Sequence, residues 1–232
     1  MQDLKAATGR KLEGIPREMI ALRASKEIPE GAYVNLGIGI PTQVCDWIEG
    51  KDVSLQAEIG MLKTGCTAAG EDVDQDCINA SCVPVTSLPG SCFFDIAESF
   101  AMIRGGCMDV IILGAMQVSE RGDLAGWANP ARGLDGIGNI GGSMDLCAGA
   151  KKLIVTMEHT TNRGEAKVLK ELTYPATARG VVDLIITDLA VIEVTPEGLL
   201  LKETSPGLTA EDVQSVTEPK LIISPDLKEM EF

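Results

Sequence analysis

Three almost uninterrupted apolar runs constrain the fold of this chain more than any other feature. They occupy residues 109–118, 152–157 and 183–188, and each is rich in Ile, Leu or Val. A strand with one solvent-facing side would alternate polar and apolar residues, so unbroken runs indicate strands buried on both faces of a parallel sheet. The segments between them supply helices that can cover such a sheet. We therefore predict an α/β fold with an open, mainly parallel sheet and flanking helices.

Local patterns predict further elements around this sheet. Helices are expected at residues 15–26, 42–48 and 93–104, the first with Ile15, Met19 and Leu22 on its apolar face. Residues 190–194 and 199–202 flank a Thr-Pro-Glu-Gly turn, which predicts an antiparallel hairpin near the C-terminus. The sequence contains no internal repeat or Pro/Ser-rich linker, so a single domain over residues 1–232 is expected.

Composition and charge exclude several classes of function. The chain has 232 residues, a net charge of -14 and a pI near 4.5. An acidic surface disfavours binding to nucleic acid or to an anionic membrane. No segment reaches the roughly 18 apolar residues of a membrane span, and residues 1–5 lack the hydrophobic region of a signal peptide. A cytoplasmic protein is the expectation.

Cysteine and histidine usage bears on the available chemistry. The seven cysteines form no CxxC pair, and their odd number prevents complete pairing, so reduced thiols are predicted. The one histidine, His159, lies in a polar stretch that predicts an exposed loop. A zinc site of mixed Cys and His ligands is therefore not expected, nor is a nucleophile activated by histidine. A carboxylate nucleophile would need neither.

Glu58 is the candidate for that carboxylate. It ends the predicted strand at residues 53–58 and precedes Gly60, while a second predicted strand at residues 33–40 breaks into a loop with Gly37 and Gly39. Ligands of open α/β sheets bind outside the carboxyl ends of the strands, so both strand exits are expected to share one crevice. A lone glutamate at a strand end is usually a solvated surface residue. Its interpretation therefore depends on the rest of the sequence.

A glycine-dense segment at residues 133–146 is the second candidate for a binding element. Glycine weakens regular elements, so we predict a shaped loop without helix or strand. The backbone N–H groups of such a loop can approach a phosphate or an oxyanion. The segment Gly37-Ile38-Gly39 lacks the third glycine of GxGxxG, and no Walker lysine follows a glycine loop, which disfavours a nucleotide-binding Rossmann domain.

In chain order, these segments resemble the β-subunit, or C-terminal half, of family I CoA-transferases. The resemblance covers nearly the whole chain, and its nearest groups are the acetate/butyrate:acetoacetate, succinyl-CoA:3-oxoacid and 3-oxoadipate CoA-transferases. The matching pieces are Asn35-Leu36-Gly37-Ile38-Gly39-Ile40-Pro41-Thr42, Glu58-Ile59-Gly60, Arg104-Gly105-Gly106-Cys107-Met108-Asp109, Leu113-Gly114-Ala115-Met116-Gln117-Val118, Gly141-Gly142-Ser143-Met144-Asp145-Leu146, Val191-Ile192-Glu193-Val194 and Gly198-Leu199.

The resemblance implies an enzyme that moves CoA between a short acyl-CoA and a carboxylic acid, such as a 3-oxoacid or a short fatty acid. Glu58 would be the catalytic nucleophile and would carry CoA as a covalent glutamyl thioester. Gly141 and Gly142 would hold an oxyanion through their backbone N–H groups, and Gly37, Gly39 and Gly60 would shape the pocket. CoA would be a substrate, with no permanently bound cofactor and no metal. An α-subunit would complete a hetero-oligomer.

The sequence also departs from the close relatives that it resembles. Ala57 and Ile59 stand where those relatives usually carry Ser and Asn, and Cys107 stands where they often carry His. Residues 136–140 look about three residues longer than the corresponding loop. The acyl donor and acceptor therefore stay open. Two alternatives remain: an acyl-CoA hydrolase using the same glutamate, and a non-catalytic small-molecule sensor, which the lack of a helix-turn-helix segment and of a basic patch disfavours.

Overall fold

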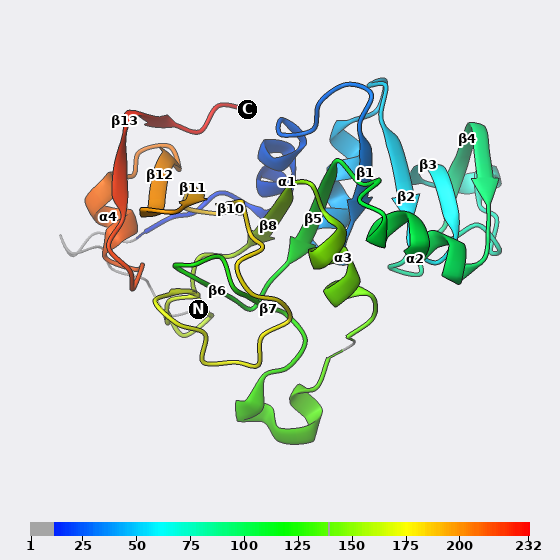
Figure 1. Cartoon of the computed structure of the whole chain (residues 1–232). Helices are drawn as coiled ribbons and strands as arrows, with labels where there is room; N and C mark the ends of the chain where they lie inside the picture. Colours follow the sequence, from blue (N-terminus) through cyan, green and yellow to red (C-terminus); the bar gives the residue numbers. More distant parts are fainter. Residues whose placement is uncertain (1–11, 139) are drawn as a thin grey trace.

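The computed structural model describes residues 12–138 and 140–232. The predictions that involve residues 1–5 and Asn139 therefore lie outside the described residues. A ten-stranded sheet forms the body of the molecule, in the order β13-β12-β11-β10-β8-β5-β1-β2-β3-β4 (Figure 1). Among the described residues, no helix combines the length and apolarity that a membrane span requires.

The centre of the sheet is parallel, as predicted. Its five strands are β2 (Ser54–Ala57), β1 (Tyr33–Leu36), β5 (Val110–Gly114), β8 (Leu153–Met157) and β10 (Leu184–Thr187). All neighbouring pairs among them are parallel. The expected strands at residues 152–157 and 183–188 are confirmed. Parallel pairing matters for function because it brings the carboxyl ends of these strands to one edge of the sheet.

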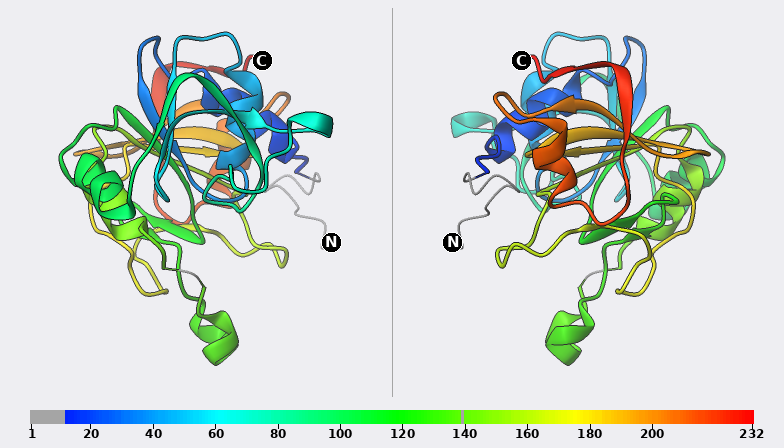
Figure 2. Two further views of the ribbon diagram at one scale, coloured as in Figure 1. Left: turned by 90° about the vertical axis from the view of Figure 1, so that its right-hand side faces the viewer. Right: turned by 90° about the vertical axis from the view of Figure 1, so that its left-hand side faces the viewer.

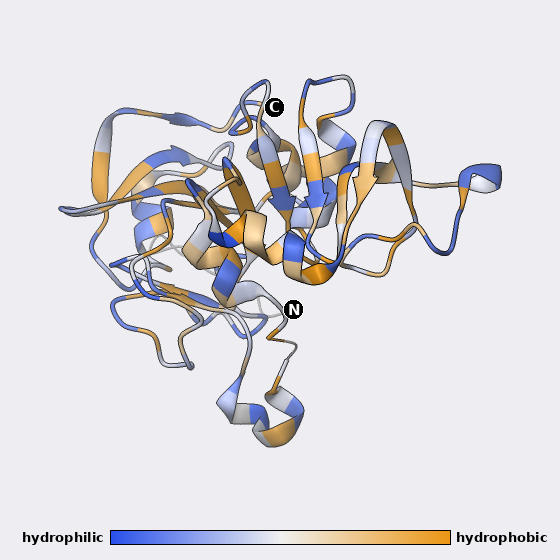
Figure 3. Cartoon of the chain, turned by 45° about the vertical axis from the view of Figure 1, so that its right-hand side comes forward, coloured by the Kyte–Doolittle hydropathy of each residue, from blue (hydrophilic) through white to orange (hydrophobic). Residues whose placement is uncertain are grey.

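Both faces of the central strands are buried, which explains their apolar runs. Val110 and Ile112 face a core that includes Ile20 of helix α1 (Arg17–Ser25). Ile111 and Leu113 face the opposite core with Ile103 of helix α2 (Ile96–Arg104). Figure 3 shows the hydrophobic residues concentrated in these strands.

The first predicted helix is present as α1, and Ile15 just before it packs against the core, but the rest of its predicted apolar face was wrong. Ile20, Ala21 and Ala24 are the apolar residues that α1 buries, whereas Met19 and Leu22 are only partly buried. The small side chains of Ala21 and Ala24 allow α1 to approach the sheet closely. A search for large apolar residues at helical spacing does not detect a face that consists partly of alanines.

The expected strand at residues 109–118 is two strands. β5 ends at Gly114, and β6 (Gln117–Ser119) belongs to a separate three-stranded sheet with β7 (Leu124–Ala125) and β9 (Val168–Leu169). Val118 is completely buried there. Because both short strands are buried, the apolar pattern continues across the break between them.

Both edges of the large sheet contain antiparallel pairs. The predicted hairpin is confirmed as β11 (Ala190–Thr195) and β12 (Gly198–Thr204), with β13 (Ile222–Glu229) beside it. At the other edge lie β3 (Met61–Thr67) and β4 (Val85–Phe93), which were not predicted. Because Phe93 ends β4, the helix expected at residues 93–104 begins later, where the Asp95 side chain accepts a hydrogen bond from the Glu98 backbone N–H at 2.9 Å.

The glycine-dense segment contains helices that its sequence does not predict. The 3-10 helix η3 (Pro130–Gly136) stands apart from the sheet (Figure 2), and α3 (Ser143–Gly149) starts directly after Gly142. The prediction of a loop through residue 146 was wrong, because the glycines stop at Gly142 and better helix formers follow. The remaining helices are η1 (Pro41–Trp47), close to the predicted residues 42–48, η2 (Gly70–Asp72) and α4 (Ala210–Gln214).

Candidate active site

The carboxyl ends of β1, β2 and β5 converge on one cavity of about 600 Å³. Glu58 directly follows β2, Gly37 directly follows β1, and Gly114 ends β5. All three line the cavity, which confirms that the two predicted strand exits share a crevice. The residues that line the cavity include Gly37, Ile38, Glu58, Ile59, Ile96, Phe100, Arg104, Leu113, Gly141, Gly142, Asp145 and Leu146.

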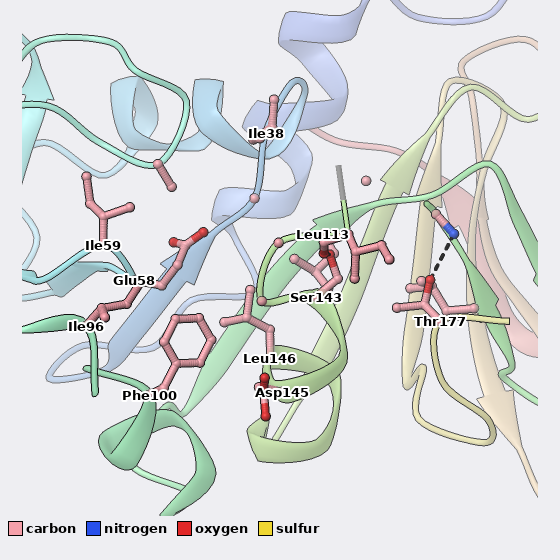
Figure 4. A pocket seen from close by; sticks show the side chains of 18 of the residues that line it. Ile38, Glu58, Ile59, Ile96, Phe100, Leu113, Ser143, Asp145, Leu146 and Thr177 are labelled. Atoms are coloured by element: carbon pink, nitrogen blue, oxygen red, sulfur yellow. Dashed lines mark hydrogen bonds between the residues drawn. The ribbon is translucent and has the colours of Figure 1, made fainter. Parts of the chain in front are cut away.

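Glu58 is half-buried and points into this cavity. Figure 4 shows its carboxylate close to the centre, with Ile59 and Ile96 on the same wall. One carboxylate oxygen, Oε2, accepts a hydrogen bond from Asn35 Nδ2 at 3.3 Å. A carboxylate in this position is oriented by the protein and remains accessible to a ligand.

Asn35 belongs to a buried polar chain that ends at Glu58. Its side chain is completely buried, and Nδ2 also lies 3.2 Å from the Gln56 carbonyl oxygen and 3.3 Å from Gln56 Oε1. Gln56 Nε2 in turn donates to Ser99 Oγ of α2 at 3.0 Å. Buried amides are costly unless they are hydrogen-bonded, so this chain ties β1, β2 and α2 into one arrangement.

Asn35 and Gln56 are members of the site that the sequence patterns do not predict. The signal that could have identified them is a polar amide in the middle of a short strand that is otherwise buried on both faces. Such residues need partners inside the fold. Within the described part of the chain, Asn35 Oδ1 is buried without a hydrogen-bond partner.

The predicted glycines occupy different places around the site. Gly37 lines the cavity, where a Cβ atom would lie 3.0 Å from Leu113 Cδ2 and 3.2 Å from the Ile112 carbonyl oxygen. Gly39 and Gly60 lie outside the lining residues. Gly60 has a φ of +129°, and a Cβ atom there would overlap the Phe94 carbonyl oxygen, so glycine is required for the turn between β2 and β3.

Gly141 and Gly142 lie on the wall formed by the start of α3. Both line the cavity, and a Cβ atom on Gly142 would overlap the Phe100 ring of α2. Glycine at this position therefore lets α2 and α3 close around the site. The structure brings these two glycines to the same cavity as Glu58.

Arg104 and Asp145 provide the remaining charges among the lining residues. Arg104 Nε donates to Asp145 Oδ1 at 2.7 Å, and the guanidinium lies 6.0 Å from the centre of the Phe100 ring. Together these contacts connect the end of α2 to the first turn of α3. In the sequence, both residues stand out only as parts of the family motifs.

His159 is a correction to the sequence analysis. It is completely buried, with Nδ1 at 2.9 Å from Thr187 Oγ1 and Nε2 at 2.8 Å from Thr217 Oγ1. Burial, aided by the charge of Lys167, lowers the pKa of His159 to about 4. It lies outside the residues that line the cavity around Glu58. The polar neighbours in sequence suggested a surface loop, but residues distant in sequence cover the ring.

Comparison with known proteins identifies the family. A family model described as "Coenzyme A transferase" matches residues 17–215. One subunit of the 3-oxoadipate CoA-transferase of Acinetobacter baylyi is 48% identical over 209 residues, covering 90% of this chain and 95% of that protein. One subunit of the succinyl-CoA:3-ketoacid coenzyme A transferase of Helicobacter pylori is 48% identical over 202 residues, covering 87% of this chain and 96% of that protein.

The fold also matches a solved structure. The acyl-CoA transferase YdiF from E. coli O157:H7, described as a thioester complex with CoA, superposes with a TM-score of 0.74 at 24% identity. The match covers 95% of this chain and 44% of the YdiF chain, so this chain spans less than half of that protein. At this identity the likeness supports the fold alone. The family model and the relatives at 48% identity show more than the fold: this chain belongs to the coenzyme A transferase family of enzymes.

Proposed function

We propose that this chain carries the nucleophile of a CoA-transferase and that Glu58 forms a covalent glutamyl-CoA thioester during turnover. The observation that carries the proposal is the oriented Glu58 carboxylate at the end of β2, directed into the cavity and hydrogen-bonded to Asn35. A glutamate suits this role because a carboxylate can attack without the help of a general base. Membership of the family agrees with this chemistry.

The proposed reaction begins with attack by Glu58 on the carbonyl carbon of an acyl-CoA. The carbon–sulfur bond breaks, which leaves an acyl-glutamyl anhydride and the CoA thiolate. The thiolate then attacks the glutamyl carbonyl carbon, releases the first carboxylate and forms the glutamyl-CoA thioester. A second carboxylate repeats these steps in reverse, leaves as the new acyl-CoA and restores Glu58.

The residues around Glu58 supply orientation and charge stabilisation in this proposal. Each addition step creates a tetrahedral oxyanion, for which backbone N–H donors are suitable partners. Gly141 and Gly142 are assigned to this role because they line the same cavity and match the glycine loop of the family. Gly37 lets the backbone after β1 approach β5 closely and thereby shapes the facing wall.

A second polypeptide is part of the proposal. Both relatives described above are named as one subunit of a transferase, which suggests that this chain works as a single-domain subunit with a different, α-type partner. Large apolar side chains beside Glu58 are exposed, among them Ile38 (60%), Ile59 (44%) and Ile96 (59%). Such a patch is typical of a surface that another polypeptide or a ligand covers. CoA enters as a substrate, and the acids are short or 3-oxo carboxylic acids like those in the relatives' names.

The test is the intact mass of this chain, purified with its partner and incubated with acetoacetyl-CoA or butyryl-CoA. The expected product is one CoA attached with loss of water, which should be absent in Glu58→Ala. Glu98→Gln is a matched control because Glu98 is an exposed glutamate on the neighbouring helix α2. An adduct that persists in Glu58→Ala would refute the assignment of the nucleophile.

Rate measurements on the same preparations distinguish transfer from hydrolysis. A transferase should pass CoA from the glutamyl thioester to added acetate or succinate much faster than water hydrolyses that thioester. If the rate does not respond to any added carboxylic acid, water resolves the intermediate and the enzyme is a hydrolase. If neither an adduct nor turnover appears with any short acyl-CoA, the proposed function is wrong.

A further inference from the structure

Two cysteines distant in sequence meet on the side of β3 that faces η1. Cys45 is buried in η1, and Cys66, which is 21 residues later, is half-buried in β3. Cys66 Sγ donates a hydrogen bond to the Cys45 carbonyl oxygen at 2.9 Å. Both thiols are free in the structure. No local motif such as CxxC marks these two cysteines in the sequence, because only the tertiary fold brings them together.

A carboxylate completes a group of three potential ligands. Asp46 Oδ1 lies 3.5 Å from Cys45 Sγ, and the ligand atoms of Cys45, Asp46 and Cys66 are all within 4.8 Å of one another. With Zn–S bonds of about 2.3 Å and Zn–O bonds of about 2.0 Å, a tetrahedral ion places sulfur and oxygen ligands about 3.5 Å apart and two sulfurs about 3.8 Å apart. The group is thus close to the required separation before any ion binds.

The surroundings of the group favour a cation. The charged groups that act on the two sulfur atoms are carboxylates, Asp46 on both and Glu49 on Cys66. A cavity of about 410 Å³ borders the group, and its lining includes Asp46, Glu49 and Cys66. One cationic side chain, Lys51, also lines this cavity, with its Nζ donating a hydrogen bond to the Ser25 carbonyl oxygen at 3.2 Å. The cavity gives the ion a path of entry and room for a water molecule, or for the Glu49 carboxylate, as the fourth ligand.

We propose that Cys45, Asp46 and Cys66 form a binding site for one thiophilic divalent cation, with Zn²⁺ as the best-matched ion. Two thiolates and one carboxylate are soft and borderline ligands that suit Zn²⁺ better than Mg²⁺ or Ca²⁺. Each cysteine gives up its proton as its sulfur binds, so one Zn²⁺ releases two protons. The sequence predicted no metal site because the chain has one histidine and no closely spaced cysteine pair. Neither criterion detects ligands that come together only in the folded chain.

The location of the site gives the ion a structural role. η1 follows the loop of Gly37 and Gly39, and β3 follows the Glu58 turn and pairs with β2. An ion bound by ligands from both η1 and β3 would cross-link the two segments that flank the cavity of Glu58. The site is separate from that cavity, so this inference does not depend on the proposed reaction.

Cobalt binding to the 232-residue chain, kept reduced with a phosphine, is the direct test. We expect sulfur-to-cobalt charge-transfer absorption and tetrahedral d–d bands that saturate at one Co²⁺ per chain and disappear when Zn²⁺ is added. Zn²⁺ should also release two protons in weak buffer. At a hundredfold excess over its dissociation constant, Zn²⁺ should raise Tm by about 5 °C or more.

Three variants locate the ion. Cys66→Ser should lose much of the charge-transfer intensity and bind Zn²⁺ at least about a hundredfold more weakly, since even outer-shell changes cost up to that much. Asp46→Asn should keep the charge-transfer intensity and bind more weakly; because Asp46 is exposed, this variant is expected to fold. Cys92→Ser changes an exposed cysteine on β4 and should behave like the unmodified chain.

The proposal is overturned by a cobalt spectrum without thiolate charge transfer, or by spectra and affinities that are the same in Cys66→Ser and Asp46→Asn as in the unmodified chain. A Tm that does not respond to Zn²⁺ would also exclude a role for the ion in cross-linking η1 and β3. Circular dichroism of each variant shows whether it is folded before binding is measured.

Discussion

At the residue scale, the chemistry depends on how one carboxylate is held. The Asn35 amide contacts both Glu58 and Gln56, and Gln56 contacts Ser99. Because the Asn35 amide both orients Glu58 and hydrogen-bonds Gln56 between two strands, a change of Asn35 should lower both the reaction rate and the free energy of unfolding. Asn35 is therefore a positioning residue for Glu58 in the proposed reaction.

We predict that Asn35→Ala lowers kcat by about a hundredfold, because a displacement of about an ångström can cost that much, and leaves KM nearly unchanged. Loss of the amide also removes a donor from buried Gln56 Oε1, so the free energy of unfolding should fall by about 1–3 kcal/mol. Steady-state kinetics and urea unfolding measure the two effects. Asn162→Ala, at an exposed asparagine, is the control. An unchanged kcat in Asn35→Ala would show that the hydrogen bond to Glu58 has no role in orientation.

His159 predicts a pH dependence of stability. Its pKa is about 4 in the folded chain, against an ordinary value of 6.5, because burial disfavours the charged ring. Between these values the unfolded chain binds the proton more strongly, so stability is present above about pH 6.5 and is lost as the pH falls toward 4. From pH 7.5 to pH 5 this one group should remove about 2 kcal/mol.

The measurement is urea unfolding at both pH values for the unmodified chain and for His159→Gln. The variant loses the titrating ring, so its stability should change less between the two pH values. Other groups near the ring, including Lys167 and Asp188, contribute equally to both proteins and cancel in the comparison. An equal loss in both proteins would mean that His159 is not the group responsible.

At the element scale, a buried ion pair fixes α1 against the sheet. Arg23 of α1 donates from Nε and Nη2 to both carboxylate oxygens of Glu203 on β12, at 2.7 and 2.9 Å. Arg23 Nη1 also donates to Glu27 at 2.9 Å, and Glu27 accepts a hydrogen bond from Lys152, just before β8, at 2.7 Å. Both partners of the central pair are about nine-tenths buried. Such a pair specifies position more than it adds net stability.

We predict that Glu203→Leu alone destabilises the chain by about 3–5 kcal/mol, because it leaves the Arg23 charge buried without its main partner. The double variant Arg23→Met, Glu203→Leu should recover most of that loss, since apolar residues of similar size replace both charges. Urea unfolding of the single and double variants measures the coupling. If the two changes are additive, the pair does not act as a unit.

At the scale of the whole molecule, the sheet separates two exposed apolar regions. β4 and β13 lie at opposite edges of the ten-stranded sheet. Phe93 is 65% exposed at the end of β4, just before α2 and its exposed Ile96, whereas Ile222 is 39% exposed on β13. The apolar surface next to the cavity is the surface that the proposed partner polypeptide would cover.

We predict that Phe93→Glu weakens association with that partner about tenfold or more, because an apolar anchor is replaced by a charge that must be desolvated. Ile222→Glu, at the opposite edge, should associate normally. Analytical ultracentrifugation of the two co-expressed polypeptides tests both variants. A partner that binds Phe93→Glu and the unmodified chain equally well must dock elsewhere.

Local sequence patterns determined the parallel strands at residues 152–157 and 183–188, the C-terminal hairpin and the position of Glu58 at a strand end. These features depend on side-chain periodicity and turn residues within about ten positions, which a sequence displays directly. The family motifs likewise identified Gly37, Gly141 and Gly142, which all line the cavity with Glu58.

Only the tertiary structure decided the contacts between distant segments. The burial of His159 by Thr187 and Thr217, the hydrogen bond from Asn35 to Glu58 and the meeting of Cys45 with Cys66 join residues 21 or more positions apart. The sequence likewise does not show that the chain leaves the large sheet after β5 and enters the small sheet at β6, because both strands are buried. Local patterns show which residues avoid water, whereas long-range packing decides which polar groups meet.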